Sequence, residues 1–120
     1  MFKSTLKTIV EQTPGAQSAI LMGCDGIAVD SFSLQNVSGD GHQSVVVEFA
    51  SVVREVAHTA TLLSVGELEE IAIKCENMTI LLAVLTSEYF VALLIGRDGV
   101  PAKGRYLLRR DAHILQAALV

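Results

Sequence analysis

The side chains best suited to catalysis or metal binding do not form a set in this sequence. The histidines fall on three separate predicted elements, so no two have the spacing of a metal site or a catalytic pair: His42, His58 and His113. Cys24 stands beside Asp25 without a cationic neighbour that would stabilise a thiolate, which leaves a turn residue or a contact residue. Cys75 is expected on the inward face of a strand. We therefore predict no catalytic residue and no metal ligand, and interpret the chain as non-enzymatic.

Glycine-containing turns are the second kind of possible site, because backbone N–H groups in such turns can bind phosphate. Gly23 and Gly26 flank one turn, and Gly39–Gly41 forms another. Neither has the Gly-Lys-Ser/Thr sequence or the Gly-x-Gly-x-x-Gly spacing of a nucleotide site. We interpret Gly39–Gly41 as part of a loop and predict no bound cofactor.

Charge separates one short segment from the rest of the chain. The formal net charge of −4 argues against a general nucleic-acid binder, since phosphate contacts need a basic surface. A basic cluster nevertheless lies near the C-terminus: Lys103, Arg105, Arg109 and Arg110. It has three interpretations, namely a solvated helix face, a contact with an acidic partner, or a contact with an anionic membrane surface.

The composition is more apolar than that of a typical globular domain. Hydrophobic residues make up 51% of the 120 residues and charged residues 18%. A membrane span does not explain this, because the longest apolar runs, Ile80–Leu85 and Phe90–Ile95, are far shorter than the ~20 residues a spanning helix needs. We find no export signal and expect a cytoplasmic protein with free thiols. An oligomer interface is the simplest place for the excess apolar side chains.

The spacing of apolar residues predicts one α/β domain over residues 1–120. Pro14-Gly15 ends a short amphipathic helix, and Asp25-Gly26 between apolar runs indicates a hairpin. Short connections favour an antiparallel meander for the last three strands. The expected elements are a helix at Phe2–Gln12, strands at Ala16–Gly23 and Ile27–Leu34, a loop at Gln35–Gly41, a helix from His42 or Gln43 to Val65, strands at Leu68–Glu76, Met78–Leu85 and Tyr89–Ile95, and a closing helix from Pro101.

The long helix is apolar on two sides. One stripe is long enough to cover a sheet: Val45, Phe49, Val52, Val53, Val56, Ala60 and Leu63. Val47, Leu62 and Val65 fall on the opposite side, so something other than this chain's own sheet should cover it. The strand that follows alternates, which is typical of an edge strand, with one face formed by Ile71, Ile73 and Cys75.

These features resemble the roadblock (dynein light chain) domain family. The hairpin Met22–Ser31 is similar to that family's small-x-Asp-Gly-hydrophobic turn, and the apolar meander followed by Gly96-Arg97-Asp98-Gly99 and a helix is similar as well. The resemblance covers nearly the whole chain and is strongest to compact bacterial members of the MglB and MglC type, MglC above all. It implies a three-layer sandwich: a five-stranded, mainly antiparallel sheet with one long helix on one face and two helices on the other.

The resemblance also implies a function. MglC-type proteins are adaptors in the cell-polarity and gliding-motility system of the Ras-like GTPase MglA, where they bind an MglB-type GTPase-activating protein and the RomR polarity protein. The expected function is thus a homodimeric adaptor, cytoplasmic and recruited to cell poles through its partners. One alternative is a co-activator that binds the GTPase directly across the long helix, although Arg54 is not expected to act as an arginine finger. A small-molecule sensor domain is a further alternative.

Two sets of site residues follow from the resemblance and from the residue pattern. Family members form homodimers by joining edge strands and packing the long helices together, which implies an interface of Val47, Arg54, His58, Leu62, Val65, Ile71 and Ile73. Turn tips are usually polar, and turn geometry explains Gly26 but leaves two apolar neighbours unexplained. We therefore predict that the first hairpin turn binds a partner through Cys24, Asp25 and Ile27.

Overall fold

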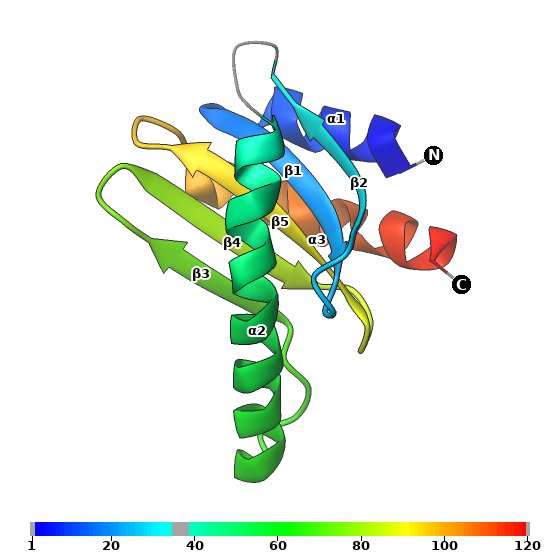
Figure 1. Ribbon diagram of the computed structural model, residues 1–120. Helices are drawn as coiled ribbons and strands as arrows, with labels where there is room; N and C mark the ends of the chain where they lie inside the picture. Colours follow the sequence, from blue (N-terminus) through cyan, green and yellow to red (C-terminus); the bar gives the residue numbers. More distant parts are fainter. Residues whose placement is uncertain (1, 35–38, 120) are drawn as a thin grey trace.

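A single antiparallel sheet with helices on both faces organises the computed structural model, which describes residues 2–34 and 39–119 (Figure 1). The strands lie in the order β2-β1-β5-β4-β3, and every neighbouring pair is antiparallel. Helix α2 crosses one face, whereas α1 and α3 cover the other. The expected sandwich is therefore confirmed. The elements are α1 (Phe2–Gln12), β1 (Ala16–Gly23), β2 (Ala28–Ser33), α2 (Gly39–Leu63), β3 (Glu70–Lys74), β4 (Met78–Val84), β5 (Tyr89–Gly96) and α3 (Pro101–Ala118).

The central strands are buried on both faces, as their unbroken apolar sequences predict. In β5, Leu93 and Ile95 point toward α1 and α3, and Phe90 and Leu94 point toward α2. Gly104 lets α3 approach this strand closely, since a Cβ at that position would lie 2.8 Å from a methyl carbon of Leu93. The sheet thus separates two apolar layers, of which the α1/α3 layer contains more buried residues.

Several element boundaries and one buried position differ from the predictions, most clearly at α2 and β3. Helix α2 begins at Gly39, so the interpretation of Gly39–Gly41 as loop is wrong; residues 35–38 of that predicted loop lie outside the described part of the chain. Strand β3 ends at Lys74, and Cys75 follows it as an exposed residue instead of packing inward. The strand is shorter than the predicted Leu68–Glu76 because its paired register with β4 runs only from Glu70 to Lys74, while residues 68 and 69 belong to the connection from α2.

The side of α2 that faces the sheet also differs from the prediction. Val46, Ala50 and Val53 are buried there, with a spacing that places them on one side of the helix. The stripe predicted to cover the sheet is largely wrong, since four of its members are exposed: Val45, Val52, Val56 and Leu63. Only the first half of α2 lies on the sheet, and the second half extends past it (Figure 1). A predicted stripe that runs the whole length of the helix therefore does not mark the buried side.

Candidate functional site

The turn between β1 and β2 has a closely hydrogen-bonded backbone. Gly26 has a φ of +89°, a region that favours glycine, and its N–H donates to Gly23 O at 2.9 Å. The Gly23 N–H donates to Ile27 O at 2.8 Å, and the Ile27 N–H donates to Asp25 Oδ1 at 3.1 Å. The carboxylate of Asp25 therefore stabilises the turn, as turn chemistry predicts.

The apolar side chains of this turn lie at the surface. Ile27 is 68% exposed and Val29 is 43% exposed, whereas Cys24 is half-buried. Ile27 therefore does not pack under the sheet. The three residues predicted to bind a partner are thus adjacent, and Ile27 presents apolar area that the fold does not use.

Two contacts from distant parts of the chain hold the turn. A guanidinium nitrogen of Arg54, on α2, donates a hydrogen bond to Cys24 O. On the other side, the Cys24 N–H donates to Glu88 O at 2.7 Å, in the β4–β5 turn. Arg54, which was predicted for the dimer interface, lies against the hairpin turn within the chain. Its acceptor is a backbone carbonyl, which leaves no signal in the sequence.

The chemistry of Cys24 fits a contact residue better than a nucleophile. Burial raises the pKa of its thiol, and nearby Asp25 and Glu88 raise it further, although Arg54 opposes the shift. The thiol therefore stays protonated near neutral pH, which disfavours nucleophilic attack.

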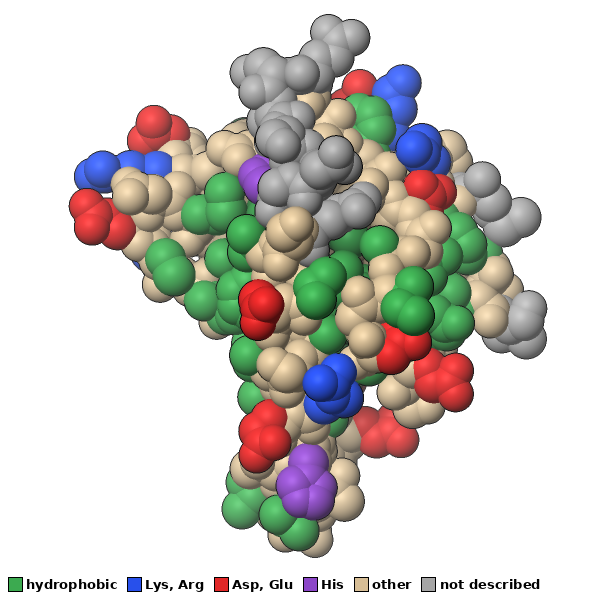
Figure 2. All heavy atoms as spheres, in the orientation of Figure 1, with side chains coloured by type: hydrophobic (Ala, Val, Ile, Leu, Met, Phe, Trp, Pro, Cys, Tyr) green, Lys and Arg blue, Asp and Glu red, His purple; other side chains and the backbone are tan. Residues whose placement is uncertain are grey.

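A second candidate surface is the half of α2 that extends past the sheet. Leu62 and Leu63 at its end are 70% and 66% exposed, and Val65, two residues after the helix, is 71% exposed. Arg54 and His58 on the helix are also exposed. Figure 2 shows hydrophobic side chains at this end of the helix. Side chains this apolar are rarely so exposed together on a monomer, which marks the surface as a contact region.

The α2 face of β3 and β4 is also incompletely covered. Ile71 and Ile73 are partly buried on it, beside Leu68, Met78 and Val84. A groove of about 1060 Å³ runs between the second half of α2, the connection 64–69 and the end of β4, and continues around that end to α3. The predicted interface residues thus divide into two groups: Val47 lies near the hairpin turn with Arg54, whereas Leu62 and Val65 lie at the far end of α2.

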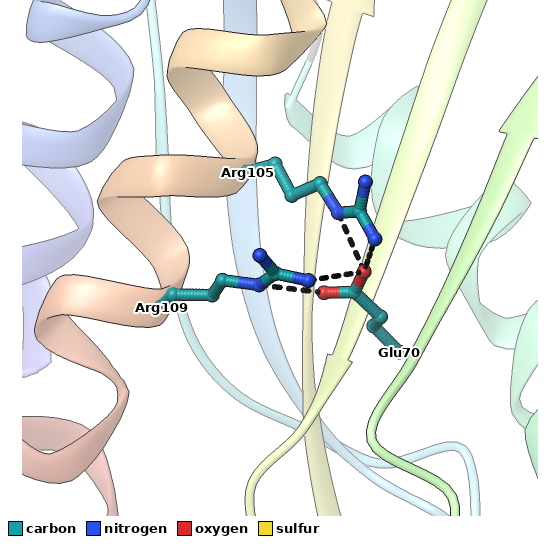
Figure 3. Close-up of polar contacts among 3 residues, drawn as sticks. All are labelled: Glu70, Arg105 and Arg109. Atoms are coloured by element: carbon teal, nitrogen blue, oxygen red, sulfur yellow. Dashed lines mark hydrogen bonds and ion pairs between the residues drawn. The ribbon is translucent and has the colours of Figure 1, made fainter.

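On the opposite face of the sheet, an ion cluster connects β3 to α3 (Figure 3). Arg105 and Arg109 both bind the carboxylate of Glu70, with 3.1 Å between Arg109 Nη2 and Glu70 Oε1. The hydrogen bond from Arg105 is the main cause of a lowered pKa for Glu70, with Arg109 adding to it against the effect of burial. Arg110 pairs with Asp111, and Lys103 lies over the Tyr106 ring. Most of the basic cluster therefore has partners within the fold.

One serine–histidine pair was not predicted. Ser18 Oγ and His42 Nδ1 are 2.5 Å apart, and burial lowers the pKa of His42. Ser18 is completely buried in β1, so a substrate has no access to its hydroxyl group. The pair attaches the start of α2 to the sheet and does not form a catalytic site.

Within residues 2–34 and 39–119, no three His, Cys, Asp or Glu side chains converge so that they could hold a metal ion. None of the helices in the described part of the chain is long and apolar enough to cross a membrane.

Solved structures with the same fold include three bacterial proteins. MglC from Myxococcus xanthus is 29% identical, with a TM-score of 0.73 over 96% of this chain and 96% of that one. A roadblock/LC7 domain from Streptomyces avermitilis is 16% identical, with a TM-score of 0.85 over 98% and 96% of the two chains. MglB from Myxococcus xanthus is 13% identical, with a TM-score of 0.84 over 98% and 93%. No protein-family model matches the chain, and no curated protein sequence is significantly similar to it. The expected resemblance to roadblock domains of the MglB and MglC type is confirmed.

Proposed function

We propose that this chain, a roadblock-fold protein similar to MglC, is a non-enzymatic homodimeric adaptor in a cell-polarity and gliding-motility system based on an MglA-type Ras-like GTPase. The observation that carries the proposal is the 29% identity to MglC over nearly the full length of both chains. The exposed apolar side chains on the hairpin turn and on α2 support it, because an adaptor needs more than one contact surface.

The partners of the adaptor are an MglB-type GTPase-activating protein and a RomR-like polarity protein, which recruit it from the cytoplasm to the cell poles. The hairpin turn with Cys24, Asp25 and Ile27 is the proposed contact. Ile27 supplies apolar area, and Asp25 keeps the turn in shape through its bond to the Ile27 N–H. An apolar side chain at the centre of such a contact contributes more than the polar groups at its rim.

The homodimer uses the two incompletely covered surfaces. In a two-fold arrangement, the extended half of α2 from one copy covers the open face of β3 and β4 in the other, and the same contact recurs in reverse. This brings Leu62 and Val65 of one copy toward Ile71 and Ile73 of its partner. His58 lies on the same exposed part of α2 and belongs to the rim of this contact.

Titration of the purified chain with the MglB-type, RomR-like and MglA-type proteins of the same cell tests this function. We expect calorimetric binding to the first two, and no change in GTP hydrolysis by the MglA-type protein when the chain is added alone. Direct binding to the GTPase with faster hydrolysis would overturn the adaptor in favour of a co-activator. Absence of binding to all three proteins would place the chain outside such a system.

A further inference from the structure

The exposed side of α3 carries positive charge, although the chain as a whole has a formal net charge of −4. Among the described residues of α3 the one carboxylate is that of Asp111, which is buried. Glu70, on β3, supplies a second carboxylate. Four of the nine basic residues of the chain lie on this side of the helix: Lys103, Arg105, Arg109 and Arg110. They therefore keep an excess of positive charge after pairing with the two carboxylates.

Helical spacing arranges the exposed residues of α3 as a central stripe between two basic rows. Arg105 and Arg109, four residues apart, form the row on the side of β3. Lys103 and Arg110, seven residues apart, form the row on the other side of the helix. The stripe between the rows consists of Ala102, Tyr106, His113 and Ala117, all exposed. We call the stripe and its two rows the α3 surface.

Internal carboxylates hold the three arginines in place and use only one edge of each guanidinium group. In Arg105 and Arg109 the Nε and Nη2 atoms contact Glu70, and in Arg110 the same two atoms contact Asp111. The Nη1 atom of each group thus lies away from its carboxylate, as Figure 3 shows for Arg105 and Arg109. A guanidinium group that is already fixed in position loses less conformational entropy when it binds a further anion.

The basic residues of α3 do not stabilise the helix itself. Positive charges are favourable in the last turn of a helix, yet α3 has no basic residue there and no acidic residue in its first turn. Lys103 instead lies in the first turn, where the helix dipole opposes its charge. Arg105 and Arg109, four residues apart, repel each other. The charges of α3 therefore point to a role outside the helix.

We propose that the α3 surface binds an amphipathic helix of a partner protein, with the apolar side of that helix on the central stripe and its acidic side chains opposite the two basic rows. Residues four and seven apart lie on one side of any helix, so a second helix along α3 offers carboxylates at the same intervals as the rows. The 18 residues of α3 give a length of about 27 Å for this contact. The α3 surface lies across the sheet from α2, so the contact is independent of the proposed homodimer.

An anionic membrane surface fits the α3 surface less well. Attachment to lipid headgroups through charge takes a cluster of about four to eight Lys or Arg residues, and here Glu70 and Asp111 neutralise part of the charge of four. Helices that lie on membranes also bury a broad apolar side. The central stripe offers one large ring, that of Tyr106, which is 57% exposed, beside His113 and two alanines. A helical partner needs less apolar area, because each of its carboxylates can pair with a guanidinium group.

A synthetic helix tests the proposal. The probe is a fluorescent peptide of three heptads with leucine at positions a and d, glutamate at e and g, and alanine elsewhere, and its control has the same composition in scrambled order. Fluorescence anisotropy measures the dissociation constant of each peptide for the full chain. We expect the probe to bind and the scrambled peptide not to bind.

Variants of the chain locate the contact. Lys103→Gln combined with Arg109→Gln removes one charge from each row, leaves Arg105 on Glu70, and should weaken probe binding roughly tenfold or more. Tyr106→Ala removes the one large ring of the stripe and should weaken binding about tenfold. The matched control combines Lys7→Gln with Arg97→Gln, which removes the same charges from exposed residues outside the α3 surface, and should change the affinity less than about twofold.

Four outcomes would overturn the proposal. Equal binding of the scrambled peptide would mean attraction between charges without a helical contact. Equal losses in the control variant and in the double variant at the α3 surface, or no loss in either, would place the peptide elsewhere. Sedimentation with phosphatidylglycerol vesicles in place of peptide binding, abolished by the double variant, would assign the surface to a membrane. Absence of binding to both peptide and vesicles would leave the surface solvated. Circular dichroism verifies that each variant is folded.

Discussion

The two faces of the sheet differ in how completely the chain covers them. Toward α1 and α3, Leu6, Ile9, Leu93 and Leu107 are fully buried in one continuous layer. Toward α2, the buried layer ends where the helix leaves the sheet, and Ile71 and Ile73 stay partly exposed. The closed face holds the fold together, whereas the open face has apolar area left for a second molecule. Substitutions on the two faces should therefore change different measurable quantities.

The largest effect is expected on the closed face. Leu107→Ala should lower the free energy of unfolding by about 2–5 kcal/mol, because it leaves a cavity in a fully buried layer. Urea unfolding of the purified chain measures this. Leu63→Ala is the matched control, since Leu63 is 66% exposed and its truncation removes little buried area within one chain. Equal losses for both variants would contradict the difference between the faces.

The open face should respond through association. Leu62→Glu places a charge in the proposed apolar contact and should raise the dimer dissociation constant at least tenfold, equivalent to about 1.4 kcal/mol. Sedimentation over a range of concentrations measures the constant, and circular dichroism should be unchanged. Val100→Glu is the control, because Val100 is also exposed but precedes α3. If the control weakens the dimer as much as Leu62→Glu does, the interface lies elsewhere.

The hairpin turn should affect partner binding and leave the dimer intact. Combined replacement of Cys24, Asp25 and Ile27 by alanine should abolish calorimetric binding to the MglB-type protein, with Gly26 kept so that the turn still forms. Ile27→Ala alone retains the Asp25 hydrogen bond and should weaken binding about tenfold. Unchanged binding in the triple variant, or loss of its fold, would mean that the turn has a structural role only.

A smaller effect is expected for the contact between α2 and this turn. Arg54→Gln shortens the side chain that binds Cys24 O, so the turn should open more often. Hydrogen exchange at the amides of residues 24–27 should become faster, with a few-fold loss of partner affinity and no change in dimer mass. The nearby exposed Glu55→Gln serves as the control, and unchanged exchange in Arg54→Gln would show that the hydrogen bond does not hold the turn.

The smallest effect concerns the covered half of α2, where His42 binds Ser18. Because burial lowers the pKa of His42 in the folded chain, the unfolded chain takes up this proton first as the pH falls below the ordinary value of 6.5. Stability from this group is thus present above pH 6.5 and is lost on acidification. The melting temperature should fall more steeply between pH 7 and 5.5 in the natural chain than in His42→Gln. Parallel curves would contradict this role.

Turn residues made most of the fold predictable. Pro14-Gly15 and Asp25-Gly26 mark element ends through backbone geometry that few other residues adopt, so α1 and β1 were placed correctly. The start of α2 was not, because Gly39 and Gly41 are poor helix formers that still lie in its first turn. Here the tertiary structure overrides local preference.

The contacts that define the candidate sites were harder to predict. Valines occur on most sides of α2, so periodicity alone does not tell which side meets the sheet. Val45 was predicted to face the sheet, whereas Val46 is the residue buried there. Glu70 meets Arg105 and Arg109 only after the sheet has formed. The predicted turn residues Cys24, Asp25 and Ile27 are adjacent as expected, and their partner-binding role stays a prediction.

The two edge strands of the sheet, β2 and β3, differ in the features that oppose pairing with further strands. Strand β2 carries Asp30, which pairs with Lys3 of α1 at 3.6 Å, and a bulge at Leu21/Met22 disturbs its ladder with β1. Charges and bulges at an edge discourage the addition of further strands. Strand β3, at the other end of the sheet, shows no irregularity in its ladder with β4 over Glu70–Lys74. In the proposed homodimer, the contact beside β3 leaves the protected β2 edges outermost, which disfavours fibril growth in a chain this rich in apolar residues.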